Sequence, residues 1–175
     1  MVDARDQSAP SRREVRKNIE RRYRHHPSVM PLVEDHHRGL ALALRCRKQA
    51  LGQMRPVGVH GLRERADELT DFISKTLERH FRAEEEVLFP LIGSRVPESR
   101  LLIAELQEGH GQIRKSSVLL KKDTSLSKSL FDLGDLLERH IRSEERELFP
   151  LFKRHVTEAE AGAVKKEIKR ILEEP

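Results

Sequence analysis

The stretch LERHFRAEEEVLFPL, residues 77–91, recurs almost unchanged as LERHIRSEERELFPL at residues 137–151. The two copies align without a gap at a shift of sixty residues, and eleven of the fifteen positions are identical. Apolar residues recur in both at three- and four-residue steps, the period of an amphipathic α-helix. Pro90 and Pro150, near the ends of the copies, are predicted to end these helices because proline disrupts the backbone hydrogen-bond ladder. The chain is therefore an internal repeat centred on one helix.

The first copy of the repeat is predicted to follow another helix and to precede a third. The preceding helix begins at Ser28 or Pro31 and ends near Gly52, where glycine and proline become frequent. The helix that carries the first copy spans about residues 62–91. After it, Pro97 starts a third helix in its opening turn. The first half of the chain is thus a helical hairpin followed by the start of a second hairpin.

The second copy lies on a fourth helix, for which Ser125 or Ser127 supplies an N-cap. A fifth, shorter helix follows, because Thr157 and Glu160 have the spacing of a capping box and the apolar pattern continues to about Leu172.

These elements predict an all-α protein, an up-down-up-down four-helix bundle with a short extra C-terminal helix and a basic N-terminal arm. Sequential helices joined by short connections pack as antiparallel neighbours. We expect residues 1–28 to form the arm, residues 29–156 the bundle, and residues 157–175 the C-terminal amphipathic helix.

Histidines and glutamates lie on the apolar stripes of these helices. His80 and Glu84 are four residues apart on the buried face, and the second copy repeats the pair. Burying an ionised carboxylate is costly unless a positive charge compensates for it, and a metal cation does so. The six predicted metal ligands are His37, His80, Glu84, His110, His140 and Glu144.

Nitrogen and carboxylate ligands without thiolates favour a first-row metal and argue against a structural zinc knot, since Cys46 is the only cysteine. Nitrogen ligands favour iron, zinc, copper or nickel, and two metals bridged by the two glutamates would divide the six ligands evenly. No catalytic residue and no organic cofactor site is predicted.

Two adjacent histidines compete for the ligand position on the first helix. Neighbouring residues on a helix point about 100° apart, so only one of His36 and His37 faces the centre. On the third helix Glu108, His110 and Ile113 follow one another at the same spacing as Asp35, His37 and Leu40. This correspondence predicts His37 as the ligand and His36 as its flank.

Other polar residues near the repeat are expected at the surface. Glu85 and Glu145 adjoin the proposed ligands and would replace them if a helix rotated, but ion pairs with Arg82, Arg142 or their neighbours are the simpler expectation. Surface positions are also expected for histidines off the stripes: His25, His26, His60 and His155.

Composition limits the class of protein. Of the 175 residues, 36% are charged and 37% are hydrophobic, which suits helices with narrow apolar stripes. No apolar run approaches membrane-spanning length, so we expect a cytoplasmic protein without membrane contact. Residues 1–24 hold eight Lys and Arg against four acidic residues, a local charge of +4 out of the total of +5. Such an arm leaves nucleic acid open as a partner, although a solvated tail is the commoner outcome.

The segments EDHHRGL, HFRAEEEVLFP, EGHGQI and HIRSEERELFP give the order His, His-x-x-x-Glu, His, His-x-x-x-Glu over about residues 31–156. In this order the chain resembles the hemerythrin-like, or HHE cation-binding, domains. The resemblance implies a four-helix bundle with a carboxylate-bridged, non-heme di-iron centre on the six residues named above.

The resemblance has one departure and leaves several functions open. Oxygen-carrying hemerythrins have a further histidine one turn after the third-helix ligand, where this chain has Arg114. The leading hypothesis is a module that binds or senses O2 or a related small oxidant, with a diatomic or peroxide ligand as its partner. Alternatives are a di-iron oxidoreductase acting on peroxide or NO, an iron-binding or iron-delivery protein, and a protein whose basic arm is the functional part. The sequence indicates neither the oligomeric state nor whether the protein is an enzyme.

Overall fold

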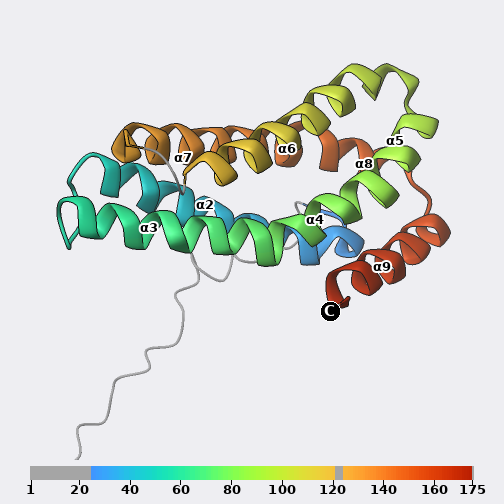
Figure 1. The fold of residues 1–175 in the computed structure, drawn as a ribbon. Helices are drawn as coiled ribbons and strands as arrows, with labels where there is room; N and C mark the ends of the chain where they lie inside the picture. Colours follow the sequence, from blue (N-terminus) through green and yellow to red (C-terminus); the bar gives the residue numbers. More distant parts are fainter. Residues whose placement is uncertain (1–24, 121–123, 175) are drawn as a thin grey trace, which may run out of the picture.

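The computed structural model describes residues 25–120 and 124–174. These residues are almost entirely helical and include no strand (Figure 1). Residues 1–24 of the predicted basic arm lie outside the described residues, as do residues 121–123 between the predicted third and fourth helices. The all-α prediction is confirmed.

The first hairpin consists of a short 3-10 turn, η1 (Pro27–Val29), then α2 (Met30–Ala50) and α3 (Val59–Phe72). Gly52 and Gly58 frame the loop between α2 and α3 with φ angles of 70° and 86°. Glycine adopts these positive angles at no steric cost, so the chain can reverse direction here.

The second long helix extends beyond α3 without interruption. It continues through the π-helical turn η2 (Ile73–Leu77), α4 (Glu78–Ala83), a second π-helical turn η3 (Glu84–Leu88) and α5 (Phe89–Arg95). It therefore runs four residues past the predicted end at Leu91.

The second hairpin repeats this arrangement. It starts with the 3-10 turn η4 (Pro97–Ser99) and α6 (Arg100–Leu120). Its second helix comprises α7 (Leu126–Ser143), the π-helical turn η5 (Glu144–Leu148) and α8 (Phe149–His155). The π-helical turns η3 and η5 begin at equivalent positions of the two repeat copies.

The prediction that Pro90 and Pro150 end their helices is wrong. Each proline lies in the first turn of α5 or α8, directly after a π-helical turn. The Phe89 N–H bonds to the Glu84 carbonyl, and the Phe149 N–H bonds to the Glu144 carbonyl, five residues back. The wider turn lets a new helical segment begin just before each proline, where proline's missing N–H and fixed φ are tolerated.

The helices pack as a four-helix bundle. α2 lies against α7 and α3, while α6 packs against α7 and α3, so each helix has its chain neighbours beside it (Figure 1). Among residues 25–120 and 124–174, no helix is both long enough and apolar enough to cross a membrane.

The last helix, α9 (Glu158–Glu173), begins at the predicted capping box. The Glu160 N–H donates to Thr157 Oγ1, and the Thr157 N–H donates to Glu160 Oε2 at 2.9 Å. The helix packs against α4, η3 and η1 at one end of the bundle (Figure 1). Its C-terminal carbonyls accept hydrogen bonds from Arg79, the residue before His80. The extra helix thus braces the segment that carries the first repeat copy.

The apolar core is divided into two clusters. One lies toward α9 and contains Val33, Leu88 and Leu148 among others. The second lies toward the α2–α3 loop and contains Leu77 and Ile141 among others. Along each long helix buried histidines or glutamates fall between residues of the two clusters, so a polar layer separates the two halves of the core.

Candidate metal centre

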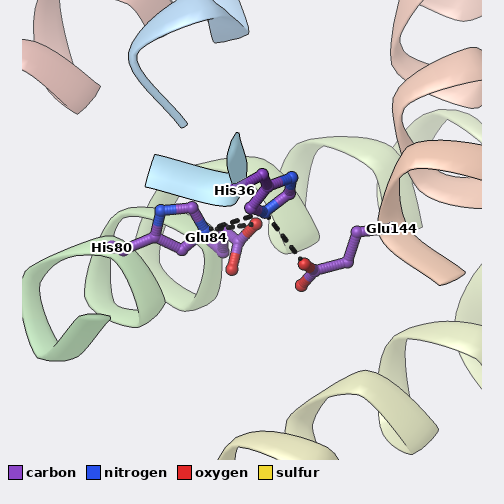
Figure 2. Close-up of side chains that lie close together, drawn as sticks. All are labelled: His36, His80, Glu84 and Glu144. Atoms are coloured by element: carbon purple, nitrogen blue, oxygen red, sulfur yellow. Dashed lines mark hydrogen bonds and ion pairs between the residues drawn. The ribbon is translucent and has the colours of Figure 1, made fainter. Parts of the chain in front are cut away.

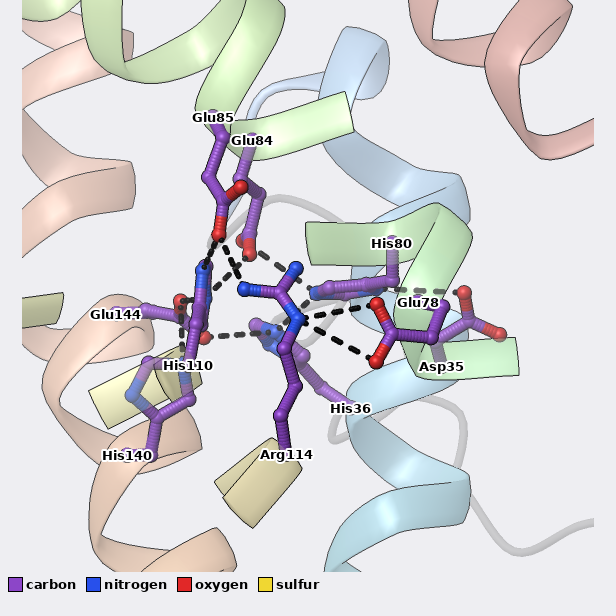
Figure 3. Close-up of polar contacts among 10 residues, drawn as sticks. All are labelled: Asp35, His36, Glu78, His80, Glu84, Glu85, His110, Arg114, His140 and Glu144. Carbon is purple, nitrogen blue, oxygen red and sulfur yellow. Dashed lines mark hydrogen bonds and ion pairs between the residues drawn. The ribbon is translucent and has the colours of Figure 1, made fainter. Parts of the chain in front are cut away.

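Every long helix of the bundle contributes side chains to this polar layer. They are His36 from α2, His80 and Glu84 from α4 and η3, His110 from α6, and His140 and Glu144 from α7 and η5. None of the six is more than 6% exposed. Four imidazoles and two carboxylates therefore meet inside the protein (Figure 3).

One half of the cluster is built on the first hairpin. The Nε2 atoms of His36 and His80 lie 3.1 Å apart. His36 Nε2 is also 3.1 Å from Glu144 Oε2, and His80 Nε2 is 3.4 Å from Glu84 Oε1. The four side chains point toward one another (Figure 2), with one ligand atom from each within 4.8 Å of the others.

The other half is built on the second hairpin. His140 Nε2 lies 3.0 Å from Glu144 Oε1, and His110 Nε2 lies 3.6 Å from the same oxygen. His110 Nε2 is also 3.3 Å from Glu84 Oε2. His110, His140 and Glu144 form a second group with the spacing of a metal site.

The two glutamates connect the halves. Glu84 directs Oε1 to His80 and Oε2 to His110. Glu144 directs Oε2 to His36 and Oε1 to His140. Each carboxylate therefore offers one oxygen to each histidine pair.

The hydrogen bonding of these atoms fits a cation. Within the described part of the chain, both oxygens of Glu84 and of Glu144 are buried without a hydrogen bond. The same holds for Nε2 of His110 and of His140. Buried polar atoms are almost always satisfied, and a carboxylate without donors is especially costly. Because the unsatisfied atoms face one another, one or two metal cations would satisfy them together.

The structure corrects the prediction for the first helix, since His36 lies in the cluster and His37 does not. His36 is fully buried, whereas His37 is exposed and borders a surface groove beside Leu40 and Leu44. The prediction followed the large apolar residues, yet Leu44 is 45% exposed. The buried face of α2 instead carries His36 among small residues: Gly39, Ala43 and Cys46.

Close helix packing explains this choice of face. A Cβ at Gly39 would lie 2.8 Å from Ile141 Cδ1, so α2 and α7 approach each other closely at this glycine. Small residues let two helices approach closely but add little to an apolar pattern. The positions of large hydrophobic residues therefore do not indicate which face of α2 is buried.

Three further carboxylates, which the sequence analysis did not propose as partners of the imidazoles, lie behind them. Asp35 Oδ2 is 3.3 Å from His80 Nδ1, and Glu85 Oε1 is 2.7 Å from His110 Nδ1. Glu145 Oε1 lies 3.6 Å from His36 Nδ1. A carboxylate at the outer nitrogen orients a ligand imidazole and fixes which nitrogen carries the proton.

The ion pairs expected for Glu85 and Glu145 with Arg82, Arg142 or their neighbours are therefore wrong, and the arginine that Glu85 contacts is Arg114 of α6. Arg82 pairs with Glu86 and Glu174, and Arg142 pairs with Glu138. The repeat could have indicated an inward position for both residues, because Glu85 and Glu145 occupy matching positions next to Glu84 and Glu144.

Aromatic rings form apolar walls around the imidazoles. Phe149 stacks on His36 at a centroid distance of 5.3 Å, and Phe81 stacks on His110 at 3.9 Å. His25 packs edge-on against Phe149 and is only 7% exposed, so the surface position expected for it is wrong. These walls restrict the motion of the rings and exclude water from the cluster.

Mutual attraction within the cluster shifts the titration of its members. Burial alone would lower the pKa of His80 and of His110, but the surrounding carboxylates outweigh it and raise the pKa to about 10 and about 9. Burial alone would raise the pKa of Glu84 and of Glu144, yet the adjacent histidines hold both below their ordinary value. The metal-free cluster therefore keeps ionised Glu84 and Glu144 beside protonated His80 and His110.

The fold and the site together define a helical-bundle protein with a buried cation-binding centre. A model of the hemerythrin HHE cation binding domain matches residues 29–152, which include all six cluster residues. The chain belongs to this family, which confirms the resemblance seen in its motifs. Comparisons with curated proteins and with solved structures gave no match.

Gly109→Ala should weaken metal binding, because the added Cβ would lie 2.7 Å from His140 Nδ1 and force that ring to move. We expect an affinity loss of about tenfold or more, the range seen when the orientation of a ligand is disturbed. Gly111→Ala is the matched control, since no described atom lies within 4 Å of its added Cβ. Metal titration of both variants measures the effect, and equal affinities would contradict the geometry.

Metal binding should release protons and strengthen with rising pH. At neutral pH the metal-free protein holds protons on His80 and His110, whose pKa values of about 10 and about 9 lie above the pH. A metal must displace them, so its apparent affinity rises by up to about tenfold per pH unit for each proton displaced. Zinc titrations between about pH 6 and about pH 8 measure this slope, and a flat profile would refute it.

Proposed function

We propose that this chain is a non-heme di-iron protein that binds or senses O2 or a related small oxidant. One observation carries the proposal: Glu84 and Glu144 each direct one oxygen to each of two histidine pairs. A carboxylate in that position is suited to bridge two metals.

The donor set divides evenly between two metal positions. His36 and His80 would hold one metal, and His110 and His140 the other, with both glutamates shared. Four imidazoles, two carboxylates and no thiolate suit iron, while zinc and manganese remain the alternatives to be distinguished. Iron would supply redox chemistry and open coordination positions for a small ligand.

The protein itself would supply a dry and rigid surrounding. His36, Glu84 and His110 are completely buried, and Phe81 and Phe149 cover two of the imidazoles. Such enclosure favours a diatomic molecule or peroxide over a larger substrate. It also strengthens the electrostatic attraction between the carboxylates and a cation, because water is excluded.

Metal analysis of paired variants tests the proposal. Purified protein and His37→Ala should each contain about two iron ions per chain, as two positions with nitrogen and oxygen ligands predict. His36→Ala should lose at least half of the metal, because it removes a buried imidazole that faces His80 and Glu144. Each variant replaces one of two adjacent histidines by alanine, so the change in the intrinsic helix propensity of α2 is the same in both.

Two outcomes would overturn the proposal. The cluster would not be the metal site if His36→Ala retained its full metal content, or if His37→Ala lost as much. Visible absorption of the oxidised protein then distinguishes iron from zinc, since zinc is spectroscopically silent. A colourless protein with stoichiometric zinc would refute the di-iron assignment.

A second candidate function is that of a di-iron oxidoreductase acting on peroxide or NO. The Arg114 side chain is directed to Glu78 and Glu85, so it supplies no ligand to the cluster. Six protein ligands shared by two metals leave open positions, which favours reactivity over simple carriage.

Consumption assays decide between the two candidates. An oxidoreductase should consume peroxide or NO faster than an equal concentration of free iron, and His140→Ala should lose this activity with its metal. Binding of O2 without consumption of either compound would favour the binding or sensing role.

A further inference from the structure

Arg114 lies one helical turn after His110 on α6, and its guanidinium joins two glutamates of the facing helix. Nη1 donates to Glu85 Oε1 at 3.0 Å, and Nε donates to Glu78 Oε2 at 3.0 Å (Figure 3). The side chains of Arg114 and Glu85 are only 32% and 29% exposed. This ion-pair group is thus partly shielded from water, where such contacts are stronger than at the open surface.

The same oxygen of Glu85 that accepts from Arg114 also contacts the ligand histidine. Glu85 Oε1 lies 2.7 Å from His110 Nδ1, among the shortest contacts of any cluster imidazole. An ionised carboxylate only accepts hydrogen bonds, so Nδ1 carries the proton. In the neutral imidazole that binds a metal, the lone pair is then on Nε2, which faces Glu84 and Glu144.

Arg114 also contacts the phenyl ring of Phe81, which stacks on the His110 imidazole. Its guanidinium carbon lies 5.1 Å from the centroid of Phe81, and Phe81 stacks on His110 with an interplanar angle of 20°. One arginine therefore contacts two of the neighbours that restrain His110, the carboxylate at its edge and one of the phenyl rings stacked on it.

We infer that Arg114 is a positioning residue for the metal centre, acting through Glu85 to hold His110 in the tautomer and orientation that bind metal. The inference rests on the proposed function, since it requires His110 to be a ligand. Without Arg114, the partly exposed Glu85 would gain freedom to turn toward water, and the Nδ1 hydrogen bond would weaken.

A looser counterpart in the other half of the cluster offers an internal comparison. Asp35 Oδ2 lies 3.3 Å from His80 Nδ1, and Arg38 Nη1 lies 3.3 Å from the other oxygen, Oδ1. The Arg38 side chain is 63% exposed. These contacts are longer than those of Arg114 and Glu85, Arg38 and His80 contact different oxygens of Asp35, and Arg38 is more exposed to solvent. Arg38 should therefore contribute less to metal binding than Arg114.

The experiment compares charge-matched variants of the metal-loaded protein. Arg114→Gln should release metal to a chelator about tenfold faster, the lower part of the range for residues that orient a metal ligand. Arg142→Gln is the control, because it removes the same charge from an arginine paired with Glu138 at the surface. The rate of metal release from Arg38→Gln should lie between the rates of Arg114→Gln and Arg142→Gln.

Arg114→Lys is a second variant of Arg114, and it keeps the positive charge. We expect it to release metal faster than the parent protein, because one ammonium group does not reproduce both carboxylate contacts.

A double variant tests whether Arg114 acts through Glu85. Glu85→Ala should itself accelerate release, and adding Arg114→Gln to it should cause less than the single-variant change, because the two residues share one interaction. Long-range ¹H–¹⁵N spectra of the zinc-loaded protein provide a readout that simple loss of stability would not change. They should show Nδ1-protonated His110 in the parent and in Arg142→Gln, with altered Nδ1–H exchange in Arg114→Gln.

The outcomes separate this inference from the proposed function. If the parent protein binds no metal, the proposed function fails and the inference fails with it. If the parent binds metal but Arg114→Gln and Arg114→Lys release it at the parental rate, the inference alone is overturned. Additive effects in the double variant would also overturn it, because Arg114 would then act independently of Glu85.

Discussion

The structure depends on two carboxylates buried in the middle of a helical bundle. Glu84 and Glu144 are at most 1% exposed, and neither has a hydrogen bond to its oxygens within the described residues. Buried charge is strongly destabilising unless neighbouring groups compensate for it. Four imidazoles around the carboxylates offset part of this cost, and a metal would offset the rest. The histidines, the aromatic rings that stack on them and the carboxylates at their outer nitrogens all surround these two buried side chains.

Backbone geometry also positions these two side chains. Each of the two buried glutamates starts a π-helical turn, and its backbone carbonyl accepts a hydrogen bond from the N–H of the phenylalanine five residues later. Such turns occur often at functional sites because they alter the direction of side chains within an otherwise regular helix. The prolines that follow lie in the first turn of new helical segments. The repeated motif Glu-x-x-x-x-Phe-Pro therefore combines a buried glutamate with the π-helical turn that positions it. Helix α9 and Arg79 then brace the first of these helices from outside.

The carboxylates at the outer imidazole nitrogens, Asp35, Glu85 and Glu145, give the two halves of the cluster different surroundings. In the half formed by His36 and His80, both outer nitrogens face an acid, Glu145 or Asp35. In the other half His110 has the short contact to Glu85, while the ring of His140 packs against the backbone at Gly109. The protein thus surrounds two similar groups of histidines and carboxylates with different electrostatic environments, so the two halves of the cluster need not behave alike.

The sequence by itself determined the helices, the repeat and five of the six cluster residues, because long apolar stripes with a buried His-x-x-x-Glu pair have a clear period. Tertiary packing decided the rest. His36 replaces the predicted His37, since the buried face of α2 is set by Gly39 and Ala43, whose small size lets α7 approach. Glu85 and Glu145 turn inward because their partners come from other helices, a relation that no local pattern contains. Periodicity reports which face of a helix is apolar, but only the contact between two helices decides which residue of that face meets the centre.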